Sequence, residues 1–251
     1  QTGRHPKLAK DFPVGIRYCQ IEEMMGAVEG ADLIIGGVSS FGIDWFGEEV
    51  LPKIPVEIPV LSVTKGLLDT EDARLLTYPA VWEQRLAAKG IRRAINAVGG
   101  PCTSYELVAH DQTEVAFCGK DIDILRKIRQ IMATDYYHLS LSTDVTGIES
   151  AVAFKNGYAL GIALTIGLNQ KVFGLDSELH FNSQAAVFGQ ATKEMKRLLD
   201  LQGAGTIENL CVGVGDLYVT VYGGRTRLVG ILLGRGIDID HLTHVVNFDV
   251  P

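Results

Sequence analysis

The stretch DVTGIESAVAFKNGYALGIALTIGL, residues 144–168, decides the fold of the C-terminal part of the chain. It is long, apolar and rich in small residues, and after Glu149 it carries one formal charge, Lys155. Asp144 or Thr146 is suited to cap the start of a helix. We therefore predict a central buried helix. The lysine on it either extends its head group to solvent or meets a partner or ligand, and burial would lower its pKa toward that of a useful base.

The helical pattern continues to the end of the chain. Residues 182–202 form a second helix pattern, and residues 213–236 form a further apolar stretch. We predict an all-helical C-terminal domain over residues 144–251, with a boundary near Thr143. On the central helix, glycines 157 and 161 stand four residues apart and predict a flat face that a neighbouring helix could approach closely.

Strand and helix patterns alternate before residue 143. This alternation is typical of βαβ units, so we predict an α/β Rossmann-type parallel sheet, N-terminally truncated, over residues 1–143. The expected strands are 14–19, 31–38, 58–66, 92–101, 114–118 and 137–142, and the expected helices are 20–30, 42–51, 70–89, a short piece after 101, and 121–133.

Polar residues follow three of the expected strands: Ser39–Ser40, Thr64–Lys65 and Gly99–Gly100–Pro101. In open α/β sheets, ligands bind beyond the carboxyl ends of the strands. Ordinary turn chemistry is the alternative for the serine pair and the Gly-Pro turn. A lysine at the end of an apolar strand points more strongly to a site.

Bulk properties narrow the function classes. The chain has 251 residues, 47% hydrophobic and 21% charged, which are globular values for one large or two ordinary domains. A net charge of -7 argues against general nucleic-acid binding but leaves room for a local basic cluster that holds a small anion. The four cysteines form no C-x-x-C pair, so we expect reduced thiols, a cytoplasmic protein and no metal site. No signal peptide is recognisable, and Lys155 with Asn156 favours a buried helix over a membrane span.

The glycine fingerprint of dinucleotide-binding sheets, G-x-G-x-x-G, does not occur in this sequence. Gly213 and Gly215 form half of it, inside the helical part. Either the protein binds no dinucleotide, or the first βα unit lies upstream of Gln1. Since the chain starts with Gln and stops at Pro251 after an apolar run, we expect a fragment that by itself binds NAD(P) poorly and is inactive.

Five short motifs occur in the order found in the NAD(P)-dependent glycerol-3-phosphate dehydrogenases, and the sequence resembles that family over about residues 1–236. The motifs are SVTKGL at 62–67, GPCTSYE at 100–106, KN at 155–156, GVGDLYVT at 213–220 and GRTRLVGILLGRG at 224–236. The resemblance implies a Rossmann domain followed by a helical substrate domain. It also implies reduction of dihydroxyacetone phosphate to sn-glycerol 3-phosphate with NADH or NADPH, in the cytoplasm, for phospholipid synthesis, by a protein that could be a homodimer.

The resemblance assigns Lys155 as the catalytic proton acceptor. From the residues themselves, Arg225 is suited to hold phosphate, and Asp216 could orient a lysine, hold a substrate hydroxyl or cap a helix. The resemblance implies substrate binding by Lys65, Gly100, Thr103, Asp216, Gly224, Arg225 and Thr226. It implies cofactor binding by Ser40, Lys65, Ser104 and Arg225.

Some positions depart from the family pattern. A Ser-Arg-Asn triplet of the family is Gly224-Arg225-Thr226 here, and Gly189-Gln190-Ala191 replaces Thr-Arg-Gly, so the phosphate site could differ. The tail at residues 235–251 resembles a DEAD-box helicase motif, to which we assign no role. Two alternatives stay open: a dehydrogenase of another hydroxy acid on the same plan, and a non-catalytic binding protein on a degraded dehydrogenase scaffold.

Overall fold

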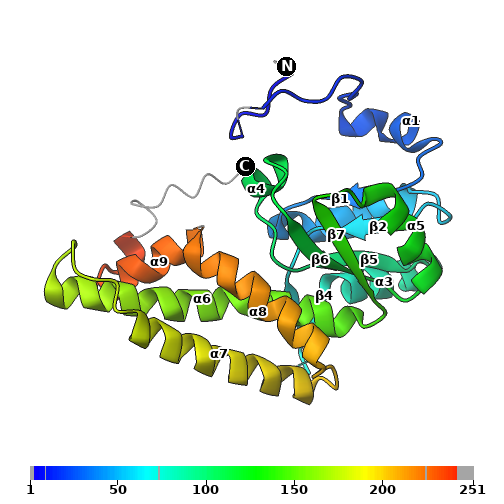
Figure 1. Ribbon diagram of the computed structural model, residues 1–251. Coiled ribbons are helices and arrows are strands. Elements are labelled where there is room, and N and C mark those ends of the chain that lie inside the picture. The colour runs from blue at the N-terminus through cyan, green and yellow to red at the C-terminus, as the bar shows by residue number, and fades with distance from the viewer. Residues whose placement is uncertain (1–2, 9, 73, 224, 242–251) are drawn as a thin grey trace.

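A computed structural model describes residues 3–8, 10–72, 74–223 and 225–241. Its N-terminal part is built on a five-stranded sheet in the order β1-β2-β5-β6-β7 (Figure 1). The strands are β1 (Ile34–Gly36), β2 (Val60–Ser62), β5 (Ile95–Gly99), β6 (Thr113–Cys118) and β7 (Tyr137–Ser142). The expected α/β sheet followed by helices is confirmed.

The sheet is mixed rather than wholly parallel. β1, β2 and β5 run parallel, β6 is antiparallel to β5, and β7 is parallel to β6. The segment between β5 and β6 contains one short helix, α4 (Ser104–Val108). A parallel neighbour needs a crossover long enough to return to the other end of the sheet. This connection stays at the carboxyl end of β5, so β6 runs back, and the prediction of a parallel sheet is wrong for this pair.

Two apolar clusters fix the helices on the sheet. Trp82 of α3 (Tyr78–Ala88) is fully buried between the sheet and the segment before β2, and its indole N–H donates to the carbonyl of Ile43 over 2.9 Å. On the other side, α5 (Ile122–Met132) buries Leu125 and Ile128 against β6 and β7. The short helical segments are η1 (Ile21–Glu23), α1 (Met24–Val28), η2 (Ser40–Gly42), α2 (Ile43–Trp45), η3 (Phe46–Val50) and η4 (Leu51–Lys53).

Two expected elements are wrong. Residues 14–19 form no strand. The expected helix over 70–89 begins only at Tyr78, because the residues before it form a small antiparallel hairpin of β3 (Leu67–Asp69) and β4 (Leu75–Thr77). Thr77 caps α3 through its hydroxyl, and Pro79 lies in the first turn, where its missing N–H costs nothing. The Thr77 cap therefore sets the start of α3, and the apolar pattern of the sequence does not reveal it.

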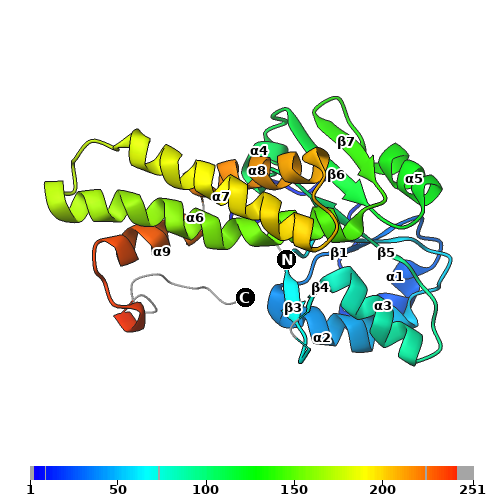
Figure 2. The same cartoon turned by 90° about the horizontal axis from the view of Figure 1, so that it is seen from below.

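The C-terminal part consists of helices, as predicted. The central α6 (Val145–Phe173) is capped by the carboxylate of Asp144, which accepts from the Gly147 N–H. α7 (Phe181–Leu201) lies beside it in both views of Figures 1 and 2, and α8 (Ile207–Tyr222) and α9 (Arg225–Gly234) also pack on it. The division into domains at residue 143 stays a prediction.

Glycines let α9 approach α6, but not the glycines expected. A Cβ added at Gly157 or Gly161 would meet nothing within 4 Å. At Gly230 it would lie 2.6 Å from the carbonyl oxygen of Leu160, and at Gly234 2.3 Å from that of Leu164. The close helix contact therefore uses these glycines of α9 together with Gly167 of α6, whose added Cβ would clash with the Ile231 carbonyl oxygen.

α6 is long and apolar enough to span a membrane by length and composition. It nevertheless packs against three helices and against β5 of the sheet. In its N-terminal half, residues 147–152 and Ala159 are buried inside the molecule. This is the packing of a core helix.

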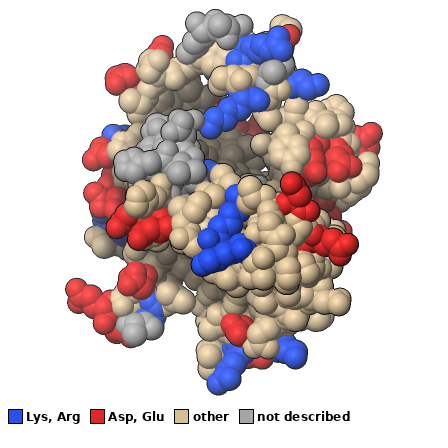
Figure 3. All heavy atoms as spheres, turned by 90° about the vertical axis from the view of Figure 1, so that its left-hand side faces the viewer, with Lys and Arg blue, Asp and Glu red and all other residues tan. Residues whose placement is uncertain are grey.

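The end of the helical part shows how the charges are distributed. On the face in Figure 3, acidic side chains gather along both flanks, and lysine and arginine form separate small groups between, above and below them. Over the described residues of this face, the basic side chains form no continuous stripe of the kind that tracks a nucleic-acid backbone.

Candidate active site

The carboxyl ends of β1, β2 and β5 lie side by side and bring the predicted polar turns together. The Thr64 hydroxyl donates to the Val38 carbonyl over 2.6 Å and ties the chain after β2 to the chain after β1. The next residue, Lys65, extends toward the turn after β5, where its ammonium donates to the Gly100 carbonyl over 3.1 Å.

Asp216 of α8 joins this lysine to the one on α6. Its Oδ2 lies 2.8 Å from Lys65 Nζ, and its Oδ1 lies 2.5 Å from Lys155 Nζ. The Asp216 side chain is 2% exposed, against 14% for Lys155 and 24% for Lys65. One buried carboxylate thus bridges two ammonium groups from segments far apart in the chain, a group we call the lysine–aspartate cluster.

Glycines on α8 explain why Asp216 can reach both lysines. A Cβ at Gly213 would come within 2.6 Å of the Met195 sulfur and 2.9 Å of the Ala151 Cβ. At Gly215 it would lie 3.3 Å from the ring of Pro101. The G-x-G pair therefore lets α8 pack closely on α6, α7 and the turn after β5. Asp216 lies in the interior of α8, whose cap is Thr206, so the helix-cap alternative is wrong.

Burial and the charge of a neighbouring lysine lower the pKa of Lys155. Burial lowers its pKa most, and the positive charge of Lys65 lowers it further, whereas Asp216 raises it. A lysine with a lowered pKa can donate and accept a proton nearer neutral pH than a free lysine can. The snorkelling alternative does not fit a side chain that is 14% exposed and bonded to a buried carboxylate.

A cavity of about 620 Å³ opens beside Lys65. The backbone of Gly100 forms part of its wall, at φ 125°, a conformation that favours glycine, and an added Cβ would lie 3.1 Å from the Cα of Val115. The remaining wall is mostly apolar and aromatic, with Ser104 and the Cys102 thiol, whose pKa burial raises. Lys65 places its charge at the edge of an apolar chamber that is large enough for a ring system.

In the described part of the chain, the remaining predicted residues form no hydrogen bond or ion pair with the cluster. The Thr103 hydroxyl donates to Glu106, and Ser40 is exposed at the start of η2. Arg225 and Thr226 begin α9, and Arg225 is exposed. The preceding turn lies near α4, since a Cβ at Gly223 would be 3.7 Å from the Tyr105 hydroxyl. Gly224 lies outside the described residues, as do residues 242–251 of the tail.

Sequence reasoning missed one buried acid. Glu149 on α6 is 0% exposed, and neither carboxylate oxygen has a hydrogen-bond partner in the described structure. Burial raises its pKa to about 8. In the sequence it stands in the first turns of a helix, where an acidic residue is common. An acid in a segment otherwise so apolar was the one available signal.

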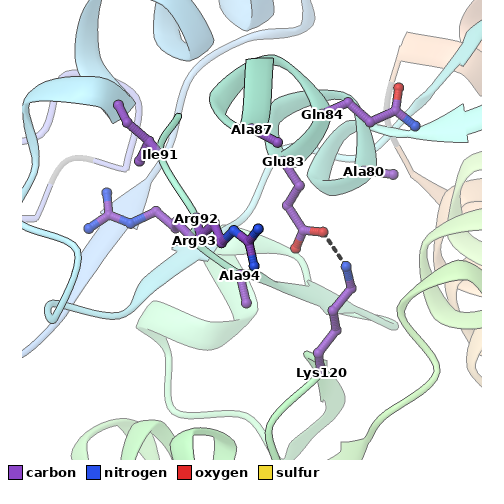
Figure 4. Close-up of a pocket in the computed structure, with 9 residues that line it drawn as sticks. All are labelled: Ala80, Glu83, Gln84, Ala87, Ile91, Arg92, Arg93, Ala94 and Lys120. Atoms are coloured by element: carbon purple, nitrogen blue, oxygen red, sulfur yellow. Dashed lines mark hydrogen bonds and ion pairs between the residues drawn. The ribbon is translucent and has the colours of Figure 1, made fainter. Parts of the chain in front are cut away.

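A second cavity, of about 610 Å³, lies at the opposite end of the sheet (Figure 4). Its charged wall consists of the Glu83–Lys120 ion pair on one side and Arg92 and Arg93 on the other. The Glu83 carboxylate also accepts from the Ile95 N–H, and Arg93 donates to the Leu51 carbonyl, so these groups hold loops on the sheet.

Comparisons with known proteins agree with the motifs. Residues 144–250, which include all but the last residue of the helicase-like tail, match the family model described as "NAD-dependent glycerol-3-phosphate dehydrogenase C-terminus". The NADP(+)-dependent glycerol-3-phosphate dehydrogenase of Archaeoglobus fulgidus is 29% identical over 94% of this chain and 68% of its own length. The glycerol-3-phosphate dehydrogenase [NAD(P)+] of Desulfotalea psychrophila is 32% identical over 86% of this chain, which spans 62% of that relative.

Solved structures show the same fold. The glycerol-3-phosphate dehydrogenase of Coxiella burnetii superposes with a TM-score of 0.78 at 22% identity, over 97% of this chain and 71% of that one. The Saccharomyces cerevisiae enzyme gives 0.71 at 19% identity, over 90% of this chain and 64% of that one. Residues 144–250 thus match the C-terminal family of NAD-dependent glycerol-3-phosphate dehydrogenases, and the two curated relatives and the solved structures that share the fold are named glycerol-3-phosphate dehydrogenases.

Proposed function

We propose that this chain carries the substrate-handling part of an oxidoreductase that interconverts dihydroxyacetone phosphate and sn-glycerol 3-phosphate with NAD(H) or NADP(H), in the cytoplasm. The observation that carries the proposal is the buried Asp216 carboxylate bridging Lys65 and Lys155 beyond the strand ends. Bacterial and archaeal relatives are named for this activity. No metal is needed, because the two lysines supply the positive charge at the site.

The lysine–aspartate cluster can handle the proton of the reaction. In reduction, Lys155 donates a proton to the carbonyl oxygen of the substrate as its carbon receives the hydride, and in oxidation Lys155 takes that proton back. Lys65 keeps a second positive charge near the same oxygen and polarises the carbonyl. Asp216 holds both ammonium groups in place and offsets the cost of placing two cations in a buried site.

The residues present fit the nicotinamide end of the cofactor. The bound cofactor supplies the hydride. Lys65, Gly100 and Ser104 line the apolar chamber beside the cluster, and Ser40 lies at the end of the adjacent strand β1. We propose that these residues and Arg225 contact the cofactor. The pyrophosphate-binding glycine turn is not among residues 1–251, so these residues account for one end of the dinucleotide only.

Arg225 is the proposed phosphate ligand. It is exposed at the first position of α9, where a guanidinium and free backbone N–H groups can bind an anion together. We propose that Gly100, Thr103, Gly224 and Thr226 complete the substrate site. This arrangement distinguishes a phosphorylated substrate from other hydroxy acids.

The test uses the purified full-length protein, because residues 1–251 by themselves are expected to bind the cofactor poorly. Oxidation of NADH and NADPH is followed by absorbance with three substrates: dihydroxyacetone phosphate, dihydroxyacetone and a 2-oxo acid. We expect turnover with the phosphorylated ketone alone. Equal turnover of the unphosphorylated ketone, or turnover of the oxo acid, would favour another dehydrogenase. Cofactor binding without turnover of any of the three would favour a non-catalytic binding protein.

A matched pair of variants ties the activity to the cluster. Asp216→Asn removes the shared carboxylate, and Asp200→Asn removes an exposed carboxylate that pairs with Lys196. We expect Asp216→Asn to lose most turnover and some thermal stability, because the variant leaves Lys65 and Lys155 without the buried carboxylate that they share. Asp200→Asn should change neither by much. Full turnover in a folded Asp216→Asn protein would place the chemistry elsewhere.

A further inference from the structure

Asn209, in the first turn of α8, is a buried polar residue that the proposed mechanism does not use. It is 2% exposed. Its Nδ2 donates to Asp144 Oδ2 over 2.7 Å and to the Ala204 carbonyl over 2.9 Å, so both amide hydrogens are used. The other oxygen of Asp144 caps α6 by accepting from the Gly147 N–H over 2.8 Å. One carboxylate thus ties the start of α8 to the start of α6, and we call this contact the Asp144–Asn209 latch.

The latch begins a parallel contact between α6 and α8, at the end of α6 nearest the sheet (Figure 1). Three close pairs run along the two helices from the latch to the lysine–aspartate cluster: Gly147 with Asn209, Ala151 with Gly213, and Lys155 with Asp216. A Cβ added at Gly147 would clash with the Asn209 amide, and one added at Gly213 would lie 2.9 Å from the Ala151 Cβ. The residues on α6 stand four apart and those on α8 four and three apart, so each set lies on one face of its helix. α8 therefore keeps one register on α6 from the latch to the cluster.

The middle pair does not by itself fix where Asp216 lies. Ala151 and Gly213 are small and apolar, and apolar contact has no preferred direction. Hydrogen bonds do have one, since they weaken steeply away from a straight geometry. Asp216 has to meet two lysines from different segments at once, and groups at a reaction centre need to be held to about 0.5 Å. A polar contact about two turns earlier on the same face of α8 supplies that constraint.

We propose that Asn209 is a positioning residue: through the latch it fixes α8 on α6, so that the Asp216 carboxylate reaches Lys65 and Lys155 together. Its importance for catalysis rests on the proposed function, whereas its hold on Asp216 can be measured without turnover. The bond from Asn209 to Ala204 lies within the turn that starts α8 and serves that turn alone. The test therefore has to separate the latch from this local bond.

Exchanging the two side chains of the latch separates these roles. In Asn209→Asp, two carboxylates face each other, and the bond to Ala204 is lost as well. In the double variant Asp144→Asn/Asn209→Asp, the new amide donates to the new carboxylate, and the amide oxygen still caps α6 at Gly147. The bond to Ala204 stays lost, and the net charge equals that of wild type. Recovery in the double variant therefore belongs to the latch.

The primary measurement follows Lys155 in the full-length protein. Its ¹³C-labelled ε carbon is titrated by NMR between about pH 7 and pH 11 and is assigned with Lys155→Arg. Asp216 raises the pKa of Lys155, so we expect the proton to be lost roughly one pH unit lower in Asn209→Asp, where Asp216 is displaced. The added carboxylate would by itself raise this pKa, so the sign of the shift identifies the displacement. The double variant should return close to the wild-type titration.

Two further variants complete the titration. Asn182→Asp makes the same change in the exposed first turn of α7 and should leave the Lys155 titration unmoved. Should Asn209→Asp fail to fold, Asn209→Ala breaks the latch without a second carboxylate and should shift Lys155 in the same direction. An unmoved Lys155 titration in a folded latch variant, or a double variant that recovers nothing, would overturn the proposal.

Turnover is the second measurement. For reduction of dihydroxyacetone phosphate, kcat should fall roughly 10- to 100-fold in Asn209→Asp, since a misplacement of about 1 Å can cost 100-fold, and most of the loss should return in the double variant. An unchanged kcat in folded Asn209→Asp would also overturn the proposal. If wild type itself shows no turnover, the proposed function fails, and the Lys155 titration still decides whether Asn209 holds Asp216.

Discussion

Two cavities of nearly equal volume, about 620 and 610 Å³, lie at opposite ends of the sheet, and each has a lysine paired with an acid in its wall or beside it. At the carboxyl end, the lysines are 24% and 14% exposed and share an aspartate that is 2% exposed. At the amino end, Lys120 is 66% exposed, and its partner Glu83 is 15% exposed.

The difference teaches what makes a charged pair chemically useful. Lys120 keeps its water, so its pair with Glu83 is weak and leaves the lysine an ordinary surface cation. Lys155 has lost most of its water, so its pKa falls and its charge depends on its neighbours. The buried cluster also joins three separate segments, whereas the Glu83–Lys120 pair joins two, α3 and the turn after β6. Cavity size does not separate the two sites, but desolvation does.

The largest difference between the two sites is expected when the charge of Lys155 is removed. In the full-length protein, Lys155→Met should lose turnover by about 100- to 10,000-fold, the usual contribution of an acid–base group. Its melting temperature should stay close to that of wild type, because deleting one of two lysines that share a carboxylate still leaves Asp216 paired.

The control for this variant is Lys196→Met, on the exposed face of α7. It removes a similar side chain from a helix and should leave kcat within about twofold of wild type. A Lys155→Met protein that folds and turns over as well as the control would remove Lys155 from the mechanism.

The burial of Glu149 at the carboxyl end of the sheet predicts a pH dependence of stability. The folded-state pKa of Glu149 is about 8 against an ordinary 4.5, so the acid contributes its full stability below about pH 4.5 and loses it as the pH rises toward 8. Glu149→Gln does not titrate. Its free energy of unfolding relative to wild type should therefore rise by roughly 3 kcal/mol between about pH 4 and pH 7.

Chemical denaturation at the two pH values measures this difference. Glu208→Gln, in the exposed first turn of α8, is the matched control and should show a much smaller change. If the two glutamine variants respond to pH alike, Glu149 is not the buried neutral acid that the structure indicates.

Arg225 tests whether the carboxyl-end site extends to a phosphate. Arg225→Ala should raise KM for dihydroxyacetone phosphate by roughly 10- to 100-fold, since a charge-assisted hydrogen bond contributes about 1.5–3 kcal/mol. Steady-state kinetics checks this, with Arg126→Ala on the exposed face of α5 as control. An unchanged KM would place the phosphate at other residues.

The smallest effect is expected at the amino-end cavity. Lys120→Met removes an exposed ion-pair partner, while Glu83 still accepts from the Ile95 N–H. We expect a change in stability below about 1 kcal/mol and no change in kcat. A large loss of turnover, measured in the same assay, would mean that the two ends of the sheet are coupled and that the comparison fails.

Much of the fold could be read from local patterns. The alternation of strands and helices before residue 143 and the long apolar segment after it predict the sheet and the central helix, because periodicity reports which side of an element is buried. Predictions from hydrophobic periodicity were wrong where a few residues set the start of an element or the direction of a strand. Thr77 and Pro79 start α3 eight residues later than its apolar pattern does, and a short connection after β5 reverses β6.

From the sequence alone we could predict which residues carry chemistry, from a lone lysine on an apolar helix, a lysine at a strand end and motifs in a family order. Only the tertiary structure decided that Lys65 and Lys155 share one carboxylate, because Asp216 lies 151 and 61 residues away from them and is brought to them by the packing of α8 on α6. Glu149 needed the structure for the same reason. A carboxyl is ordinary or unusual according to the water around it, and water is excluded by segments that come together only in the folded chain.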